Sequence, residues 1–88
     1  RWLVEEKGAM MIGSDTSGLE QMATPPAGSD SFMPVHNYLL IEQGVHIAEF
    51  HYLEELAAEE VYEFTYIATT NKIRGTTAGF TMRPLAIY

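Results

Sequence analysis

The chain has 88 residues, of which 47% are hydrophobic and 19% are charged, values typical of a folded domain near the small end of the size range. It contains no cysteine, which excludes a disulfide framework and thiolate metal sites. The formal net charge is −7, and no Lys or Arg occurs between Lys7 and Lys72, so the clustered cations of a nucleic-acid site are missing. No apolar run reaches the length of a membrane span. These features are compatible with a cytoplasmic protein that has no nucleic-acid or membrane partner.

The first third of the sequence predicts a helix, a strand and a long connection. Arg1–Lys7 is typical of the end of a helix, which Gly8 would stop. Ala9–Ile12 is a continuous apolar run, which favours a parallel strand buried on both faces. Residues Gly13–Met33 are rich in Gly, Ser, Asp and Pro and are expected to lie over the carboxyl edge of the sheet, where open α/β sheets bind ligands. This order matches the second half of a βαβ unit, so we expect a processed chain or a piece of a longer protein.

The rest of the sequence predicts two further helices and three further strands. Pro34 suits the first position of a helix that ends at Gly44, and Val45–Phe50 follows as a strand. The remaining elements are an amphipathic helix, an alternating strand, a polar connection and a last strand: Tyr52–Glu60, Val61–Ala68, Thr69–Phe80 and Thr81–Tyr88. Pro84 within the last strand indicates a sheet edge or a bulge.

His36 and Glu49 are the strongest candidates for a chemical site. Side chains alternate along the Val45–Phe50 strand, so Glu49 continues the apolar row of Val45 and Ile47, where a carboxylate is costly unless it is paired, protonated or bound to a metal. His36 lies in the first turn of the preceding helix, and a helix that runs back over the sheet can bring this turn toward the end of the strand. One imidazole and one carboxylate suit zinc or manganese, but one or two more ligands must come from elsewhere.

Less specific interpretations of the same residues stay open. From the residues alone, His36 can be a hydrogen-bonded structural histidine and Glu49 a capping or ion-paired acid. Asp15 follows a buried strand and can reach a ligand, although an Asx turn is typical of such a position. His46 and His51 have no motif around them and are interpreted as structural. The sequence contains no nucleophile elbow, phosphate-binding glycine loop, HExxH helix or Cys/His metal spacing.

Four blocks cover nearly the whole chain: IGSDTSGLEQ, PVHNYLLIEQGVHIAEFHYLEEL, VYEFTYIA and MRPLAIY. In their order and spacing these blocks resemble the C-terminal portion of the metal-dependent cyclase family, which includes bacterial kynurenine formamidases and isatin hydrolases. Members of the family typically have Gly-x-Asp-x-x-Ser after a strand, then a His-x-x-Leu-Leu helix, an apolar strand ending in Glu-x-x-x-Leu, and a last strand with Arg-Pro-hydrophobic-Ala-Ile.

The resemblance implies an α/β fold of the swivelling β/β/α type, of which residues 1–88 would be one partial domain with a mixed sheet and short helices. It also implies a zinc or manganese site that activates water to hydrolyse a cyclic amide or formamide. His36 would be a metal ligand or a catalytic proton-transfer residue and Glu49 a metal ligand. Asp15 and Ser17 match the strand-end loop of the family, whose role is positional.

The sequence departs from the family pattern in two respects. The family's N-terminal His-x-Gly-Thr-His-x-Asp motif, the main source of metal ligands, does not occur, so no competent metal site and no activity are expected in the isolated chain. Residues 69–72 and 78–83 replace the family's Pro-Leu-Lys/Arg stretch and Gly-Ser-Pro-Val-Arg turn, which leaves the pocket wall and the substrate open.

Two alternatives come from other functional classes. One is a non-catalytic remnant of the fold that binds a small molecule or another chain as an oligomer. The other is a structural interaction module built on the aromatic row of the predicted Val61–Ala68 strand, Tyr62, Phe64 and Tyr66. For all three hypotheses, the sheet edges left exposed by the absent half of the fold are expected to be covered in a homo-oligomer. The full-length hydrolase would take a small-molecule amide as its substrate.

Overall fold

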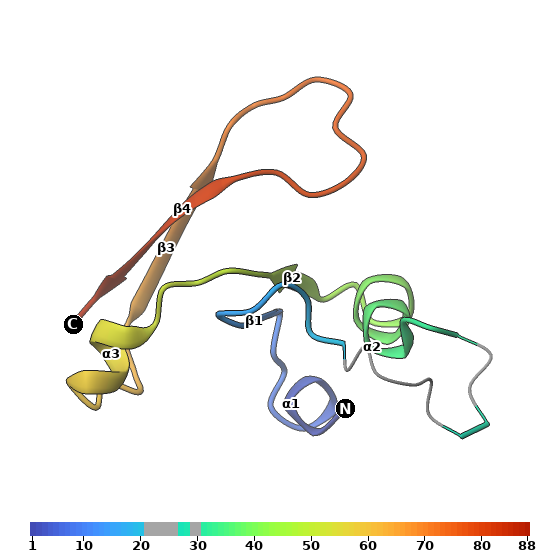
Figure 1. Cartoon of the computed structure of the whole chain (residues 1–88), viewed down its shortest axis with the longest axis horizontal. Helices are drawn as coiled ribbons and strands as arrows, with labels where there is room; N and C mark the ends of the chain where they lie inside the picture. The colour runs from blue at the N-terminus through green and yellow to red at the C-terminus, as the bar shows by residue number, and fades with distance from the viewer. Residues whose placement is uncertain (21–26, 29–30) are drawn as a thin grey trace. The chain divides into compact units, whose positions relative to one another are not determined.

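The structure, a computed structural model, describes residues 1–20, 27–28 and 31–88 (Figure 1). These residues form a small mixed α/β chain with short helices and two two-stranded sheets. The chain divides into two compact units, a first unit at Arg1–Tyr52 and a second unit at Leu53–Tyr88. Parallel and antiparallel pairing occur in separate sheets, so the expectation of one mixed sheet is wrong for the described residues.

The sheet of the first unit pairs β1 (Met11–Gly13) with β2 (His46–Ala48) in parallel. The ladder continues beyond both strands, because the backbone N–H of Ser14 donates to the carbonyl of Ala48 at 3.1 Å and that of Phe50 donates to Thr16 at 3.1 Å. The loop that leaves β1 is therefore held beside the segment that leaves β2. Parallel pairing of the first strand is confirmed, but burial on both faces is not: Met10, just before β1, is 80% exposed, and within the described residues β1 pairs with a single strand.

The helices of the first unit are short and irregular. Helix α1 spans Trp2–Glu5, and α2 spans Pro34–His36 with Pro34 at the predicted first position. Helix α2 continues directly into a π-helix, η1 (Asn37–Glu42), which Gly44 ends with a φ of +64°. The core of the unit lies where η1 meets β2, and its buried side chains are Leu39, Val45 and Ala48.

The second unit is a helix followed by a β-hairpin. Helix α3 spans Glu54–Ala58, and β3 (Thr65–Thr70) pairs with β4 (Met82–Ile87) in antiparallel register. Pro84 lies opposite Ala68 without a bulge, so its predicted position on an edge strand is confirmed. The hydroxyl of Tyr88 donates to the carboxylate of Glu59, which connects the end of β4 to the end of α3.

The strand predicted at Val61–Ala68 starts later than expected. Pairing with β4 begins at Thr65, and Tyr62 and Phe64 precede the paired segment. Tyr62 is 83% exposed, whereas Tyr66, within β3, is half-buried, so the predicted aromatic row is not packed along its whole length. Alternation predicts which side chains share a face, but it does not predict where a partner strand is present to pair with. Within the described part of the chain, no helix has both the length and the apolar composition required to cross a membrane.

Candidate functional site

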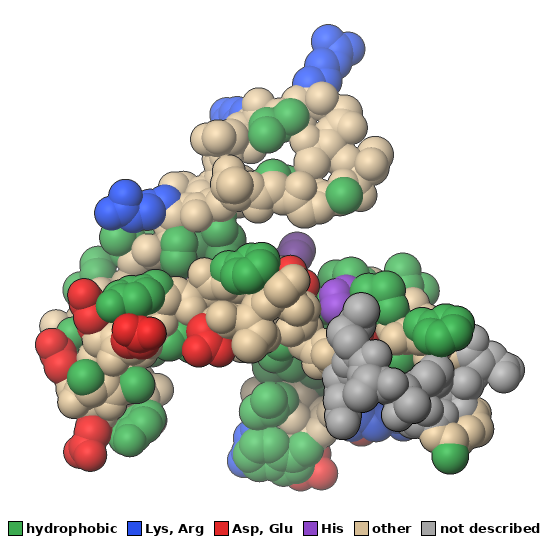
Figure 2. Space-filling model, in the orientation of Figure 1, with side chains coloured by type: hydrophobic (Ala, Val, Ile, Leu, Met, Phe, Trp, Pro, Cys, Tyr) green, Lys and Arg blue, Asp and Glu red, His purple; other side chains and the backbone are tan. Residues whose placement is uncertain are grey.

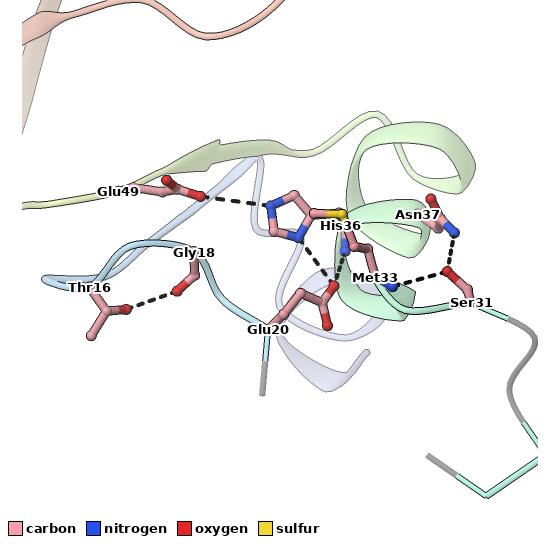
Figure 3. A network of polar contacts seen from close by, with 8 residues as sticks. All are labelled: Thr16, Gly18, Glu20, Ser31, Met33, His36, Asn37 and Glu49. Carbon is pink, nitrogen blue, oxygen red and sulfur yellow. Dashed lines mark hydrogen bonds and ion pairs between the residues drawn. The ribbon is translucent and has the colours of Figure 1, made fainter. Parts of the chain in front are cut away.

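The His36 imidazole lies between two carboxylates in the first unit. Its Nδ1 atom is 3.1 Å from Oε1 of Glu20, and its Nε2 atom is 3.7 Å from Oε1 of Glu49 (Figure 3). The three side chains come from the loop after β1, from the last residue of α2 and from the residue after β2. The structure therefore brings together His36 and Glu49, the two residues predicted from the sequence, and adds Glu20 on the opposite edge of the ring.

Glu20 holds the start of the helix that carries His36. The residue before the helix is Met33, whose side chain makes no capping hydrogen bond. The free N–H groups of the first turn therefore need an acceptor from elsewhere. Oε1 of Glu20 accepts the backbone N–H of His36 at 2.7 Å, and the side chain of Glu20 is only 5% exposed. The same oxygen thus fixes the helix start and one edge of the imidazole.

The surroundings of Glu20 act on its pKa in opposite directions. Burial favours the neutral acid, but hydrogen bonds from the backbone and side chain of His36 and from the backbone of Val35 favour the carboxylate. The hydrogen bonds outweigh burial, and the pKa of Glu20 lies below its ordinary value. Glu20 is therefore ionised at neutral pH and can only accept hydrogen bonds.

An ionised Glu20 determines which nitrogen of His36 carries the proton. Because the carboxylate accepts only, the Nδ1 atom beside it must be the donor, and the Nε2 atom of a neutral ring then has a lone pair. This lone pair faces the carboxylate of Glu49 across 3.7 Å. Two acceptors in this arrangement repel each other unless a proton on the ring or a cation lies between them.

Gly18 lies beside both the His36 imidazole and the Glu49 carboxylate. A Cβ atom at position 18 would lie 3.7 Å from Oε1 of Glu49 and 3.9 Å from Cε1 of His36, which are ordinary contact distances. The φ of Gly18 is +81°, a conformation that side-chain-bearing residues rarely adopt. The Thr16 hydroxyl donates to the Gly18 carbonyl at 2.9 Å and holds this turn in place (Figure 3).

Glu49 is not the buried acid that strand alternation predicted. Strand β2 ends at Ala48, and the buried residues of this segment are Val45 and Ala48 rather than Val45, Ile47 and Glu49. The side chain of Glu49 is 35% exposed, so its carboxylate keeps contact with water and does not require a partner for its charge. The reason is the short strand: the following residue, Phe50, turns away with a φ of +55°.

The other residues singled out from the sequence lie outside the contacts of the imidazole. Asp15 and Ser17 are exposed, and the hydrogen bonds of their loop are made by Ser14 and Thr16, whose hydroxyl oxygens are 3.0 Å apart. His46 is exposed on β2. The backbone N–H of His51 donates to the Ser14 carbonyl at 2.9 Å, which extends the ladder between the two strand-end segments.

Sequence reasoning missed Glu20. The residue lies in a connection without periodicity, sixteen positions before His36, so no spacing rule relates the two. An indirect signal was present: Met33 and Pro34 begin the helix without a side chain that can accept the first N–H groups. Such an uncapped start requires an acceptor from another segment, although it does not identify which one.

No single position in the described residues gathers three metal-binding side chains. Across residues 1–20, 27–28 and 31–88, no group of three His, Cys, Asp or Glu side chains is arranged to hold one ion. Glu20 and Glu49 lie on opposite ring nitrogens, so only Glu49 can share an ion with His36 Nε2. A cavity of about 560 Å³ in the first unit is lined by Arg1 and by residues of β1, of the connection that follows β1, of α2 and of η1, and neither His36 nor Glu49 contributes to its wall.

Comparisons of the chain with protein-family models, with curated proteins and with solved structures find no match.

Proposed function

We propose that the chain is the C-terminal part of a cyclase-family metal-dependent hydrolase with the swivelling β/β/α fold, in which His36 and Glu49 supply two ligands of a zinc or manganese ion. One observation carries the proposal: Nε2 of His36 faces Oε1 of Glu49 at 3.7 Å while Glu20 occupies Nδ1. The resemblance of the sequence blocks supports it, because the same histidine and glutamate match late metal ligands of the family.

The side chains present fit a divalent ion in their chemistry. Imidazole nitrogen and carboxylate oxygen are both accepted by zinc, and a histidine that binds a metal almost always donates its other N–H to a carboxylate or carbonyl. Glu20 takes that second role at 3.1 Å from Nδ1. Two ligands do not complete a site, so at least one more protein ligand has to be supplied by residues other than these.

A bound divalent ion would polarise the amide carbonyl of a substrate and lower the pKa of a water molecule. The chain's own contribution is orientation. Glu20 keeps the proton on Nδ1 and fixes the ring relative to the helix start, so that Nε2 is presented toward Glu49. Gly18 leaves the space beside both groups free of a side chain. The substrate class that follows from the resemblance is a small cyclic amide or a formamide.

The proposal is tested on the full-length gene product that contains this sequence. Formamide hydrolysis and isatin ring opening are measured for the wild type and for His36→Ala, Glu49→Gln and His46→Ala. We expect His36→Ala and Glu49→Gln to lower activity by about 100-fold or more. Each removes a proposed metal ligand, and the loss of a residue that only supports a ligand already costs about 10- to 100-fold. His46→Ala is the matched control, since His46 is an exposed histidine on β2, and it should retain activity. Full activity in His36→Ala would overturn the proposal.

The 88-residue chain allows a separate test of the ligand pair. Mn²⁺ is titrated into the labelled chain, and the paramagnetic broadening of amide signals is mapped. We expect weak binding, no hydrolysis, and the strongest broadening next to His36 and Glu49, lost in Glu49→Gln. Helix α3 provides the internal comparison, because Glu54 and Glu55 are adjacent acids in its first turn. Broadening centred on α3 and unchanged by Glu49→Gln would contradict the assignment.

A further inference from the structure

Among the described residues, no strand pairs with the outer edge of β3, and the strand itself has no charge, Pro or Gly that would block pairing. In the described residues, β3 belongs to a two-stranded sheet and pairs only with β4, so its second edge has no strand partner. Its sequence, Thr-Tyr-Ile-Ala-Thr-Thr, contains no charge, no Pro and no Gly and is rich in β-branched residues. An open edge of this composition is a template for another strand.

The outer edge of β4 differs in this respect. Arg83 and Pro84 lie within the paired part of β4, opposite Thr69 and Ala68. A charged side chain and a Pro, which has no N–H to donate, are devices that natural sheets use to block edge pairing. The hairpin therefore has one protected edge and one unprotected edge.

Charges in the second unit are separated along the hairpin axis. Its cations, Lys72, Arg74 and Arg83, lie at or next to the loop that joins β3 to β4. Its acids lie at the opposite end, in and after α3: Glu54, Glu55, Glu59, Glu60 and Glu63. On the hairpin, Figure 2 shows Lys and Arg side chains at the loop and along the strands beside it, whereas acidic side chains surround α3. A parallel neighbour would bring like charges together, whereas an antiparallel neighbour would bring opposite charges together.

One face of the hairpin also exposes apolar side chains. Ile67 is paired with Leu85, and Ile87 lies two residues further along the same face; their exposed fractions are 41%, 48% and 56%. A two-stranded hairpin alone is marginally stable in water, and additional strands are needed for independent stability. A four-stranded sheet would extend this face and provide cross-strand neighbours for its side chains.

We propose that β3 is a self-association edge, at which two copies of this chain pair their β3 strands antiparallel about a two-fold axis. The pairing forms a four-stranded sheet in the order β4–β3–β3–β4, with a protected β4 strand at each outer edge. Lys72 and Arg74 of each copy then lie beside the acids that precede β3 in the other copy, Glu60 and Glu63. This interface does not depend on the metal site proposed above.

The experiment is a charge-reversal exchange measured by sedimentation equilibrium over a range of protein and salt concentrations. The acidic variant carries Lys72→Glu and Arg74→Glu, and the basic variant carries Glu60→Lys and Glu63→Lys. We expect the wild type to dimerise with a Kd that rises with salt, because exposed charge pairs are screened. Each variant alone should dimerise at least about tenfold more weakly, since like charges now meet at both ends of the interface. An equimolar mixture of the two variants should recover the dimer.

A matched control reverses the same number of cations in the first unit. Arg1→Glu with Lys7→Glu changes the net charge as much as the acidic variant does but leaves the hairpin unchanged. This control should dimerise like the wild type, and circular dichroism should show that every variant is folded. A wild type that stays monomeric at all concentrations would overturn the proposal. So would variants that dimerise like the wild type, or a mixture that gains no dimer.

Amide hydrogen exchange identifies which edge pairs. In an antiparallel hairpin, alternate N–H groups of each strand point away from the partner. We expect the outward N–H groups of Thr65–Thr70 to become protected as the protein concentration rises, while those of Met82–Ile87 stay unprotected. Concentration-dependent protection in β4, or in the β1–β2 sheet, would assign the interface elsewhere and overturn the inference.

Discussion

Glu20 and Glu49 approach the same imidazole from two regions of the first unit that hold them in different ways. Glu20 belongs to the connection after β1, and its side chain is 5% exposed and accepts hydrogen bonds from the backbone and the ring of His36. Glu49 follows β2, is 35% exposed, and is 3.7 Å from the ring, beyond hydrogen-bond distance. The Glu20 carboxylate is therefore held by hydrogen bonds, whereas the Glu49 carboxylate is more exposed and more weakly held.

The difference shows how burial and hydrogen bonding assign different roles in stability to two acids beside one ring. A buried carboxylate that accepts several N–H groups is stabilised as a charge. A half-exposed carboxylate opposite a lone pair keeps its capacity to bind a proton or a cation. The two acids should therefore affect different properties. Removal of Glu20 should mainly lower the stability of the fold, and removal of Glu49 should mainly weaken the proposed metal binding.

The largest effect on stability is expected for Glu20→Ala. The substitution leaves the N–H groups at the start of α2 and the ring N–H of His36 without their acceptor, and unsatisfied buried donors cost about 1–3 kcal/mol. We expect the free energy of unfolding in urea to fall by about 2 kcal/mol. Glu20→Gln, which retains an acceptor oxygen, should lose less. A Glu20→Ala protein as stable as the wild type would remove the structural role assigned to this acid.

The pH dependence of stability should also depend on Glu20. Because its pKa is lower in the folded chain than its ordinary value of 4.5, the folded state is stabilised by the ionised form. This contribution is fully present above pH 4.5 and is lost as the pH falls through the folded pKa. Unfolding measured between neutral pH and pH 3 should therefore show a loss of stability in the wild type that is smaller in Glu20→Gln. Equal slopes in the two proteins would contradict the assignment.

A smaller effect, about 1 kcal/mol, is expected for Gly18→Ala. The added Cβ meets no atom closer than 3.7 Å, so the cost comes from the φ of +81° rather than from a clash. Gly79→Ala serves as the control, because Gly79 is in open space and has no positive φ. Thermal unfolding of the two variants should separate them, with the Gly18 variant less stable. Equal transition temperatures would show that the turn beside the imidazole is not fixed as described.

The smallest effect on stability is expected for Glu49→Ala, less than about 0.5 kcal/mol, because exposed ion pairs contribute little. Its effect should be seen in metal binding instead, which isothermal titration calorimetry with Zn²⁺ measures. If Glu49→Ala lost as much stability as Glu20→Ala, the two carboxylates would contribute equally to the fold, and the distinction between them would be wrong.

The sequence predicted the elements that have strong local signals. Pro34 and Gly44 marked the start and the end of a helical segment, and the helix-to-strand order correctly suggested that His36 comes near Glu49. It did not predict the π-helical turns of η1, because the i to i−5 pattern has no periodicity of its own in so short a segment. It also did not predict Glu20, since a contact between an aperiodic loop and a helix start depends on tertiary structure.

Burial was the least predictable property. Ala9–Ile12 reads as a strand covered on both faces, yet Met10 is exposed, because coverage depends on neighbours that the run itself does not specify. Glu49 was placed in a buried row on the assumption of a six-residue strand, whereas β2 pairs only over His46–Ala48. For Met10 the missing information was the number of neighbouring strands, and for Glu49 it was the length of the paired segment.

The state of the His36 ring tests the central claim most directly. In the labelled 88-residue chain, nitrogen chemical shifts report which ring atom carries the proton, before and after addition of Zn²⁺. The arrangement of Glu20, His36 and Glu49 predicts a proton on Nδ1 in the neutral ring and a Zn²⁺-induced change at Nε2 that disappears in Glu49→Gln. A neutral ring with its proton on Nε2, or a Zn²⁺ response that is absent at His36, would contradict the account.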